Sequence, residues 1–340
     1  MKVPITRTFF DQRDFELVLE PLRNGWIAQG AFVEQLEDRF SKYVGAPHAI
    51  AVTSGTSALH LAMVALDIGP GDEVLVPAFT WIATANAVEY VGAKPVFCDI
   101  DPGSFNIDVA QLESKITDRT RAVIPVHLFG LPAEMEAILT LAEKYGLAIV
   151  EDAACGLGAY YEEQHVGNFG KTGCFSFHPR KAITTGEGGM LTTADDEIDN
   201  LLRALRNHGA SLSGFARHES KRTFLLSEYR HLGFNYRMTD LQGALGVAQM
   251  EKIDWIQKQR RSRAAVYDEL LGNETFLRLP HCPDNMTHAY QAYVCLYQPK
   301  KASPETLQEL NEQRNNVMVA LEEKGISTRQ GTHAVTLQEY

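Results

Sequence analysis

The sequence predicts an α/β fold: a mostly parallel, mixed sheet with helices on both faces, followed by a smaller α+β domain. Between residues 48 and 193, short apolar runs alternate with stretches whose apolar residues recur every three or four positions. Such alternation of strands and helices is typical of a parallel sheet covered on both faces. From about residue 240 the alternation gives way to long helical patterns. We therefore expect a large domain over 1–239, including an N-terminal arm, and a small domain over 240–340.

The elements of the large domain follow from these patterns in order. Apolar runs predict strands over 48–54, 73–78, 95–100, 121–130 and 146–153. Two further runs, 174–178 and 188–193, are expected to extend the sheet as a reversed edge. Helical spacing predicts helices over 55–67, 82–92 and 132–146. Residues 207–238 have little periodicity, which favours either a functional segment or a flexible one.

The small domain is expected to be mainly helical. Its patterns predict a long helical stretch over 240–271 and a helix over 305–325, with strands over 289–298 and 326–330.

Composition favours a cytoplasmic enzyme. The chain has 340 residues, of which 45% are hydrophobic, and a formal net charge of −11, which argues against a general binder of nucleic acid or membrane surfaces. No apolar run reaches the length of a membrane span, and residues 1–10 lack the pattern of a signal peptide. The five cysteines are scattered and odd in number, so we expect neither a disulfide framework nor a zinc site.

A turn of small hydroxyl residues predicts a phosphate-binding site. Thr53, Ser54, Thr56 and Ser57 flank Gly55 where a strand passes into a helix. Free N–H groups and the helix dipole at such a junction suit a phosphate, although a plain helix cap uses the same residue types. No GxGxxG motif follows the early strands, so the sequence lacks the fingerprint of a nicotinamide dehydrogenase.

Asp152 and Lys181 each follow a predicted strand. In open α/β sheets ligands bind at the carboxyl ends of the strands, where Asp152 stands. Its partner is either structural, such as a helix N-terminus or an arginine, or the cationic ring nitrogen of a ligand. Lys181 lies between the apolar run 175–177 and a glycine cluster, Gly186, Gly188 and Gly189. Most lysines are simply exposed, but glycine permits close backbone approach to a bound molecule.

Together these residues favour pyridoxal phosphate (PLP). This cofactor needs a lysine for a Schiff base, an acid opposite its pyridine nitrogen and a phosphate cradle. Lys181, Asp152 and the turn at Thr56 and Ser57 supply one of each. Trp81, which begins a helix, has a flat indole that could stack on the ring, the alternative being core packing.

The same motifs resemble those of the DegT/DnrJ/EryC1/StrS family of PLP-dependent nucleotide-sugar aminotransferases. The resemblance lies in residues 54–62, 77–88, 150–155, 175–189, 207–209 and 233–246. It covers residues 25–251 in order and is weaker up to residue 340. It implies the aspartate aminotransferase-like PLP fold type I, with a seven-stranded mixed sheet, a small C-terminal domain and a homodimer with shared active sites.

The resemblance also implies roles for single residues. Lys181 would bind PLP covalently, Asp152 would pair with the pyridine nitrogen, and Trp81 would stack on the ring. The phosphate would be held by the turn at Gly55, Thr56 and Ser57, by Ser176, and by Asn235 of the neighbouring subunit. Arg237 would contact the cofactor or a substrate anion, with a structural salt bridge as its alternative role.

Two features depart from the family pattern. Cys155 stands three residues after the aspartate, where relatives often have Gln or His near the ring hydroxyl of the cofactor, and a thiol is a weak donor. Relatives also usually continue beyond residue 340, so the small domain is expected to be incomplete.

The expected activity is transfer of the amino group of L-glutamate to a nucleotide-diphosphate keto-sugar. Residues 177–189 and 331–335 resemble perosamine-synthase-type members, which favours a GDP-linked 4-keto-6-deoxyhexose aminated at C4. A sugar-nucleotide dehydratase is an alternative, but such enzymes carry histidine at the position of Lys181. A non-catalytic, PLP-binding regulatory protein is another.

Overall fold

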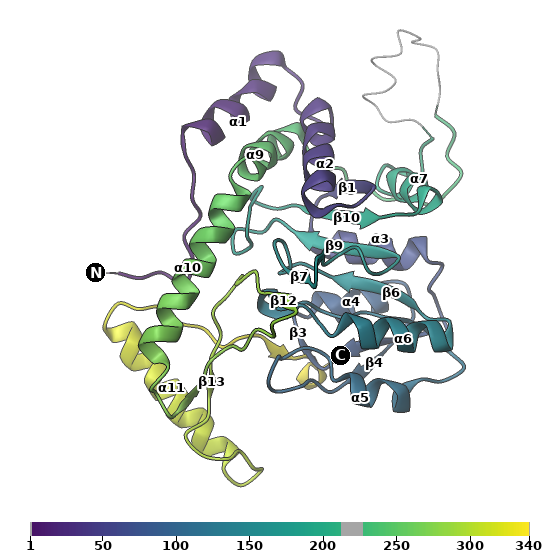
Figure 1. Cartoon of the computed structure of the whole chain (residues 1–340). Helices are drawn as coiled ribbons and strands as arrows, with labels where there is room; N and C mark the ends of the chain where they lie inside the picture. The colour runs from purple at the N-terminus through teal and green to yellow at the C-terminus, as the bar shows by residue number, and fades with distance from the viewer. Residues whose placement is uncertain (1, 212–226, 340) are drawn as a thin grey trace.

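The computed structural model describes residues 2–211 and 227–339. Part of the aperiodic segment 207–238 therefore lies outside the described residues. A seven-stranded sheet forms the centre of the molecule (Figure 1), with the strand order β1-β10-β9-β6-β5-β2-β4. Its strands are β1 (His48–Val52), β2 (Glu73–Pro77), β4 (Lys94–Cys98), β5 (Thr120–Val123), β6 (Ala148–Asp152), β9 (Thr172–Ser176) and β10 (Gly189–Thr193). The predicted α/β class and the seven-stranded mixed sheet are confirmed.

The strand directions place most carboxyl ends at one edge of the sheet. β2, β4, β5, β6 and β9 pair in parallel, and β10 is antiparallel to both of its neighbours, β9 and β1. The reversed strand is thus β10, one position inside the edge, and the edge strand β1 runs with the parallel set. The expected reversed edge is corrected in this respect: only one strand is reversed, and it is not the outermost.

Helices cover both faces of the sheet because its strands bury side chains on both. Ile50 and Val52 of β1 pack with the layer of α3 (Gly55–Ala65), α4 (Ala83–Tyr90) and α7 (Asp196–Leu205). Ala49 and Ala51, on the opposite face, pack with α2 (Ala31–Val44) and α9 (Asp240–Met250). This alternation is the two-residue period of a strand. Farther along the sheet, the second face is covered by α6 (Met135–Tyr145) and the short α5 (Val109–Leu112).

The helical stretch predicted over 240–271 is two helices, α9 and α10 (Ile253–Leu271), separated at Glu251 and Lys252. α9 packs against α1 (Gln12–Asn24) and α2. The buried carboxylate of Asp240 accepts hydrogen bonds from the N–H groups of Gly30 and Val33 at 2.9 and 3.0 Å, which caps α2. We therefore propose that α9 belongs with the large domain and that the boundary lies after it rather than at residue 240.

Beyond α9 the chain leaves the sheet along α10 (Figure 1) and forms a region with little regular strand. The helix predicted over 305–325 is present as α11 (Leu307–Glu323). The strand predicted over 289–298 is reduced to β13 (Leu296–Tyr297), and that over 326–330 to one bridge between Ile326 and Val3 of the N-terminal arm. The remaining short elements are β3 (Phe79–Thr80), β7 (Tyr160–Tyr161), β8 (Gln164–His165), β11 (Leu277–Arg278), β12 (Met286–Thr287) and β14 (His333–Ala334), with single 3₁₀ turns at Glu113–Lys115, Leu128–Gly130 and Val335–Leu337.

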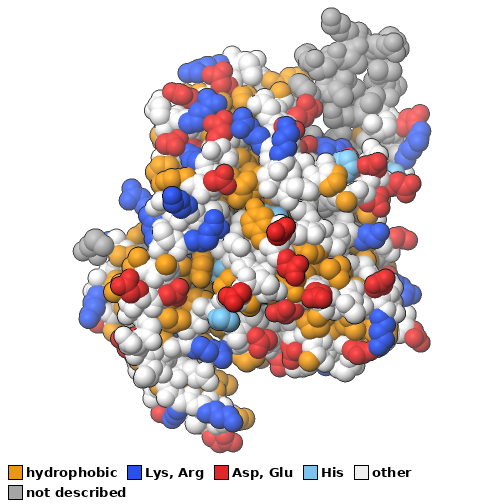
Figure 2. Space-filling view, in the orientation of Figure 1, with side chains coloured by type: hydrophobic (Ala, Val, Ile, Leu, Met, Phe, Trp, Pro, Cys, Tyr) orange, Lys and Arg blue, Asp and Glu red, His pale blue; other side chains and the backbone are white. Residues whose placement is uncertain are grey.

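The surface agrees with the acidic composition. On the face shown in Figure 2, Asp and Glu side chains gather over α5 and α6, while Lys and Arg are scattered. Among the residues that the structure describes, no helix is long and apolar enough to cross a membrane.

Candidate active site

The carboxyl ends of β1, β9 and β6 bring three of the predicted site segments to one edge of the sheet. β1 leads into the turn before α3, β9 ends at Ser176 before the loop of Lys181, and β6 ends at Asp152. Because these strands all point the same way, residues more than a hundred positions apart in sequence converge.

The turn before α3 is held close to the neighbouring strand ends by two glycines. A Cβ on Gly55 would lie 2.9 Å from Cβ of Ser176, and a Cβ on Gly189 would lie 2.4 Å from the carbonyl oxygen of Ser54. Any side chain at either position would push the turn away from β9 and β10. Gly189 therefore leaves room for the turn before α3. Glycine is favoured at position 186 because the backbone there has a positive φ of 82°.

Ser57 contributes to this turn from inside. Ser54 is the N-cap of α3, and Ser57 completes its capping box: the Ser57 hydroxyl accepts from the Ser54 N–H at 2.9 Å and also lies 3.1 Å from the hydroxyl of Thr53. Thr56 is half-buried, and the N–H groups of Gly55 and Thr56 have no carbonyl partner within the helix. We therefore propose that these N–H groups and the Thr56 hydroxyl hold a phosphate, while Ser57 shapes the turn.

Asp152 is buried at the end of β6, with 5% of its surface exposed. Oδ2 accepts a hydrogen bond of 2.8 Å from the Thr84 hydroxyl, and Oδ1 accepts one of 3.1 Å from the Ala154 N–H. Within the described residues it forms no ion pair with an arginine or lysine. A buried carboxylate with only neutral partners is costly, which favours an external cation as its partner.

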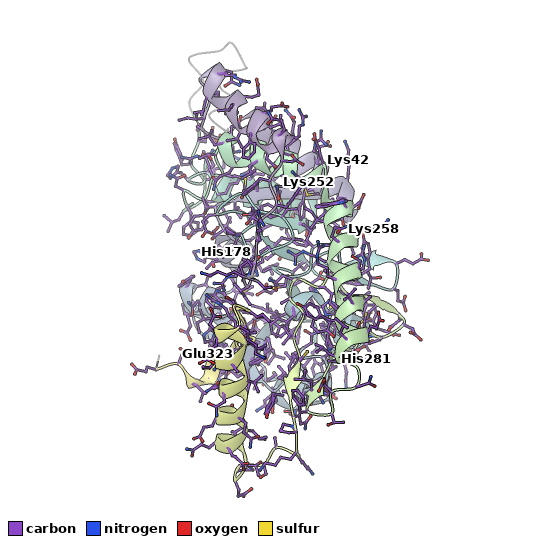
Figure 3. The ribbon with its side chains drawn as sticks, turned by 90° about the vertical axis from the view of Figure 1, so that its left-hand side faces the viewer. Lys42, His178, Lys252, Lys258, His281 and Glu323 are labelled. Atoms are coloured by element: carbon purple, nitrogen blue, oxygen red, sulfur yellow. The ribbon has the colours of Figure 1, made fainter. Side chains whose placement is uncertain are left out.

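Lys181 lies in the loop between β9 and β10, and its amine points at Cys155. Nζ donates to Sγ of Cys155 at 3.2 Å, and both side chains are half-buried. Cys155 follows Asp152 by three residues, so the amine lies beside the segment that carries the buried carboxylate. Figure 3 labels His178, which belongs to the same loop and accepts from the backbone N–H of Lys181 at 2.8 Å.

Trp81 is exposed to solvent over 58% of its surface, so it is not packed in the core. It follows β3, which pairs with β14, and this pairing brings His333 against the indole at a ring-centroid distance of 5.6 Å and an interplanar angle of 63°. An exposed indole at this edge is available to a ligand.

Arg237 and Asn235 lie in a segment that passes the end of β1. Arg237 forms a backbone bridge with Val52, and its guanidinium donates to the side chain of Asn207 at 2.9 Å. The described residues hold no salt bridge to Arg237, and burial, followed by the nearby Arg206, lowers its pKa. Asn235, two residues earlier, is exposed.

The residues that the structure describes contain no cluster of His, Cys, Asp and Glu able to hold a metal ion. The groups described above supply an amine, a buried carboxylate and a turn whose N–H groups face no carbonyl of their own helix.

Comparison with known proteins decides which chemistry this arrangement serves. The model of the DegT/DnrJ/EryC1/StrS aminotransferase family matches residues 9–340. The chain belongs to this family. It is 41% identical over 297 residues to GDP-perosamine synthase of Caulobacter vibrioides, and the aligned part covers 86% of this chain and 76% of that protein. It is 40% identical over 300 residues to the spore coat polysaccharide biosynthesis protein SpsC of Bacillus subtilis, and the aligned part covers 88% of this chain and 77% of SpsC.

Solved structures agree with this membership. A Streptococcus pneumoniae protein described as a sugar aminotransferase superposes in its PMP form with a TM-score of 0.91 at 26% identity, covering 99% of this chain and 87% of that one. Its PLP form gives a TM-score of 0.88 at 27% identity, with coverage of 100% and 87%. The chain is thus a PLP-dependent sugar aminotransferase, and the predicted family, enzyme class, PLP fold type and cofactor are confirmed.

The residues of the site fit PLP. The turn at Gly55 and Thr56 offers N–H groups to a phosphate, and Asp152 is a buried carboxylate without a cationic partner among the described residues. Lys181 presents an amine 3.2 Å from Sγ of Cys155, three residues after Asp152. When bound, PLP supplies an electron sink for negative charge that develops on the substrate. The chain's own residues would then bind and orient: Asp152 would keep the ring nitrogen protonated, Trp81 would cover the ring, and the Lys181 amine would carry protons.

Thr84 and His333 were missed by the sequence reasoning. Thr84 could have been found, because it is three residues after Trp81 in the same motif and lies in the first turn of α4, which begins at Ala83. His333 could not, because only the pairing of β14 with β3 brings it to Trp81.

Proposed function

We propose that this protein transfers the amino group of L-glutamate to C4 of a GDP-linked 4-keto-6-deoxy sugar. The observation that carries the aminotransferase assignment is the Lys181 amine at the edge of the sheet, 3.2 Å from Cys155 and next to the segment of Asp152. The sugar and nucleotide are supported by the 41% identity to GDP-perosamine synthase. The similar identity to a spore coat polysaccharide protein supports a role in surface polysaccharide or glycoside biosynthesis.

A panel of keto-sugar nucleotides tests this proposal. Incubated with L-glutamate, the GDP-4-keto-6-deoxyhexose should be aminated faster than dTDP- and UDP-linked 4-keto sugars or a 3-keto sugar, with products measured by mass spectrometry. Faster amination of a dTDP or UDP sugar would overturn the nucleotide assignment and leave the aminotransferase assignment intact. Elimination of water from the sugar instead of amination would favour the dehydratase.

We further propose a homodimer in which each active site takes Lys181 from one subunit and Asn235 from the other. The exposed side chain of Asn235, at the end of the segment that pairs with β1, supports this arrangement. Mixing inactive Lys181→Ala with inactive Asn235→Asp should restore activity, because about half of the dimers are then mixed and each mixed dimer has one intact site. The expected recovery is roughly a quarter of wild type by that count.

The mixing experiment has an opposite outcome if the proposal is wrong. Were Asn235 to act in the site of its own subunit, no mixed dimer would contain an intact site. Subunit exchange, confirmed by native mass spectrometry, would then restore no activity.

A further inference from the structure

Arg260 on α10 contacts the backbone of the loop that carries Lys181. Its Nη2 donates to the carbonyl oxygen of Lys181 at 3.0 Å. Its Nη1 donates to the carbonyl oxygens of Tyr290 and Gln291, each at 3.0 Å. Figure 3 labels His178 in the Lys181 loop and Lys258 on the stretch of α10 that carries Arg260. One side chain thus joins three segments that are far apart in sequence.

The chemistry of this contact explains why the residue is arginine. The guanidinium is planar and carries five donors in fixed directions, so it can serve three carbonyl oxygens at once, whereas a lysine ammonium is a compact point charge. Burial lowers the pKa of Arg260, and within the described residues no carboxylate forms an ion pair with it. Burying the Arg260 guanidinium costs desolvation free energy, so its charge is expected to have a specific role here.

The backbone of Lys181 is held on both sides as a result. Its N–H donates to the carbonyl oxygen of His178 at 2.8 Å, and its carbonyl oxygen accepts from Arg260. The adjacent carbonyl of Arg180 accepts from Nε2 of Gln291 at 2.8 Å. Arg260 and Gln291 therefore fix the position from which the Lys181 side chain leaves the loop.

We propose that Arg260 is a positioning residue that aims the Lys181 amine into the active site by holding the carbonyl oxygen of Lys181. The proposal rests on the assignment of Lys181 as the lysine that binds PLP. Arg260 acts through Lys181 and needs no contact with substrate. Its removal should slow covalent capture of PLP because the loop would no longer be fixed, and a displacement of about 1 Å can cost a hundredfold in rate.

The test compares three variants of the full chain. Arg260→Met removes the charge and the donors, Arg260→Lys keeps the charge but loses the planar fork, and Arg263→Met is the matched control. Arg263 lies one turn farther along α10 and is exposed, and among the residues that the structure describes it donates only to Gln259 of its own helix. Each protein is freed of PLP, mixed with PLP and reduced with borohydride at timed intervals, and peptide mass spectrometry measures the PLP fixed at each lysine.

Capture at Lys181 should be about tenfold slower or more in Arg260→Met, several-fold slower in Arg260→Lys, and unchanged in Arg263→Met. In the amino-transfer reaction kcat should fall more than KM rises. If Arg260→Met fails to fold, Arg260→Lys alone decides. Wild-type capture in either Arg260 variant would overturn the proposal, as would an equal loss in Arg263→Met. Capture at a different lysine in the wild type would instead overturn the assignment of Lys181.

Discussion

Replacing Lys181 with alanine is expected to abolish amino transfer while leaving the fold intact. The side chain lies in a loop outside the core clusters, and its amine contacts Sγ of Cys155 at 3.2 Å, so little packing is lost. Without the amine, PLP can bind only through its phosphate and ring, and the visible absorbance of the lysine-bound cofactor should disappear. Activity should fall by at least about a thousandfold, the scale expected when a covalent and proton-transfer group is removed.

Lys171→Ala is the matched control for this variant. Lys171 is exposed just before β9, and β9 separates it from the edge where Lys181 lies. It should keep wild-type absorbance and activity. The assignment of Lys181 would be wrong if borohydride still fixed PLP to another lysine of Lys181→Ala with normal visible absorbance.

Replacing Asp152 with asparagine should leave binding nearly intact and slow catalysis strongly. The amide has the shape of the carboxylate: its Oδ1 can still accept from the Ala154 N–H, and its Nδ2 can donate to the Thr84 hydroxyl oxygen where Oδ2 of Asp152 accepts. It lacks the negative charge that keeps a cationic ring nitrogen protonated while charge develops on the substrate. Such an interaction is stronger in the transition state than in the ground state, so kcat should fall about a hundredfold or more with a smaller change in KM.

Thr84→Val separates the charge of Asp152 from its orientation. The valine removes the 2.8 Å hydrogen bond to Oδ2 and leaves the carboxylate in place. We expect a loss of kcat smaller than that of Asp152→Asn, and recovery in Thr84→Ser, which keeps the hydroxyl. Rapid mixing of each variant with L-glutamate measures the rates that are compared. A near-normal rate in Asp152→Asn would contradict the role of this carboxylate.

The sequence predicts the parallel strands well because both of their faces are buried. Ile50 and Val52 pack on one face of the sheet and Ala49 and Ala51 on the other, so β1 reads as a continuous apolar run. The glycine cluster after Lys181 is visible in the sequence, but the requirement for Gly189 is not local: it starts a strand that passes against the distant turn at Ser54.

Prediction fails where distant segments decide the structure. The break between α9 and α10 is hidden in a continuous helical pattern, and Asp240 reveals the place of α9 only through the N–H groups of α2 that it caps. The contact of Arg260 with the carbonyl oxygen of Lys181 depends on where α10 crosses the loop. The role of Ser57 at the phosphate stays a prediction; its hydroxyl also accepts from the Ser54 N–H in the capping box of α3, a contact that residue type alone does not show.

The reaction of the PLP-loaded protein with L-glutamate alone shows whether the Lys181 site transfers an amino group or only binds the cofactor. Without any sugar nucleotide, we expect that the visible absorbance of the lysine-bound cofactor disappears and that one 2-oxoglutarate forms per active site. The protein should then regain the absorbance when 2-oxoglutarate is added in excess. Unchanged absorbance with no 2-oxoglutarate formed, in protein whose Lys181 is fully occupied by PLP, would contradict amino transfer at this site and favour a non-catalytic PLP-binding protein.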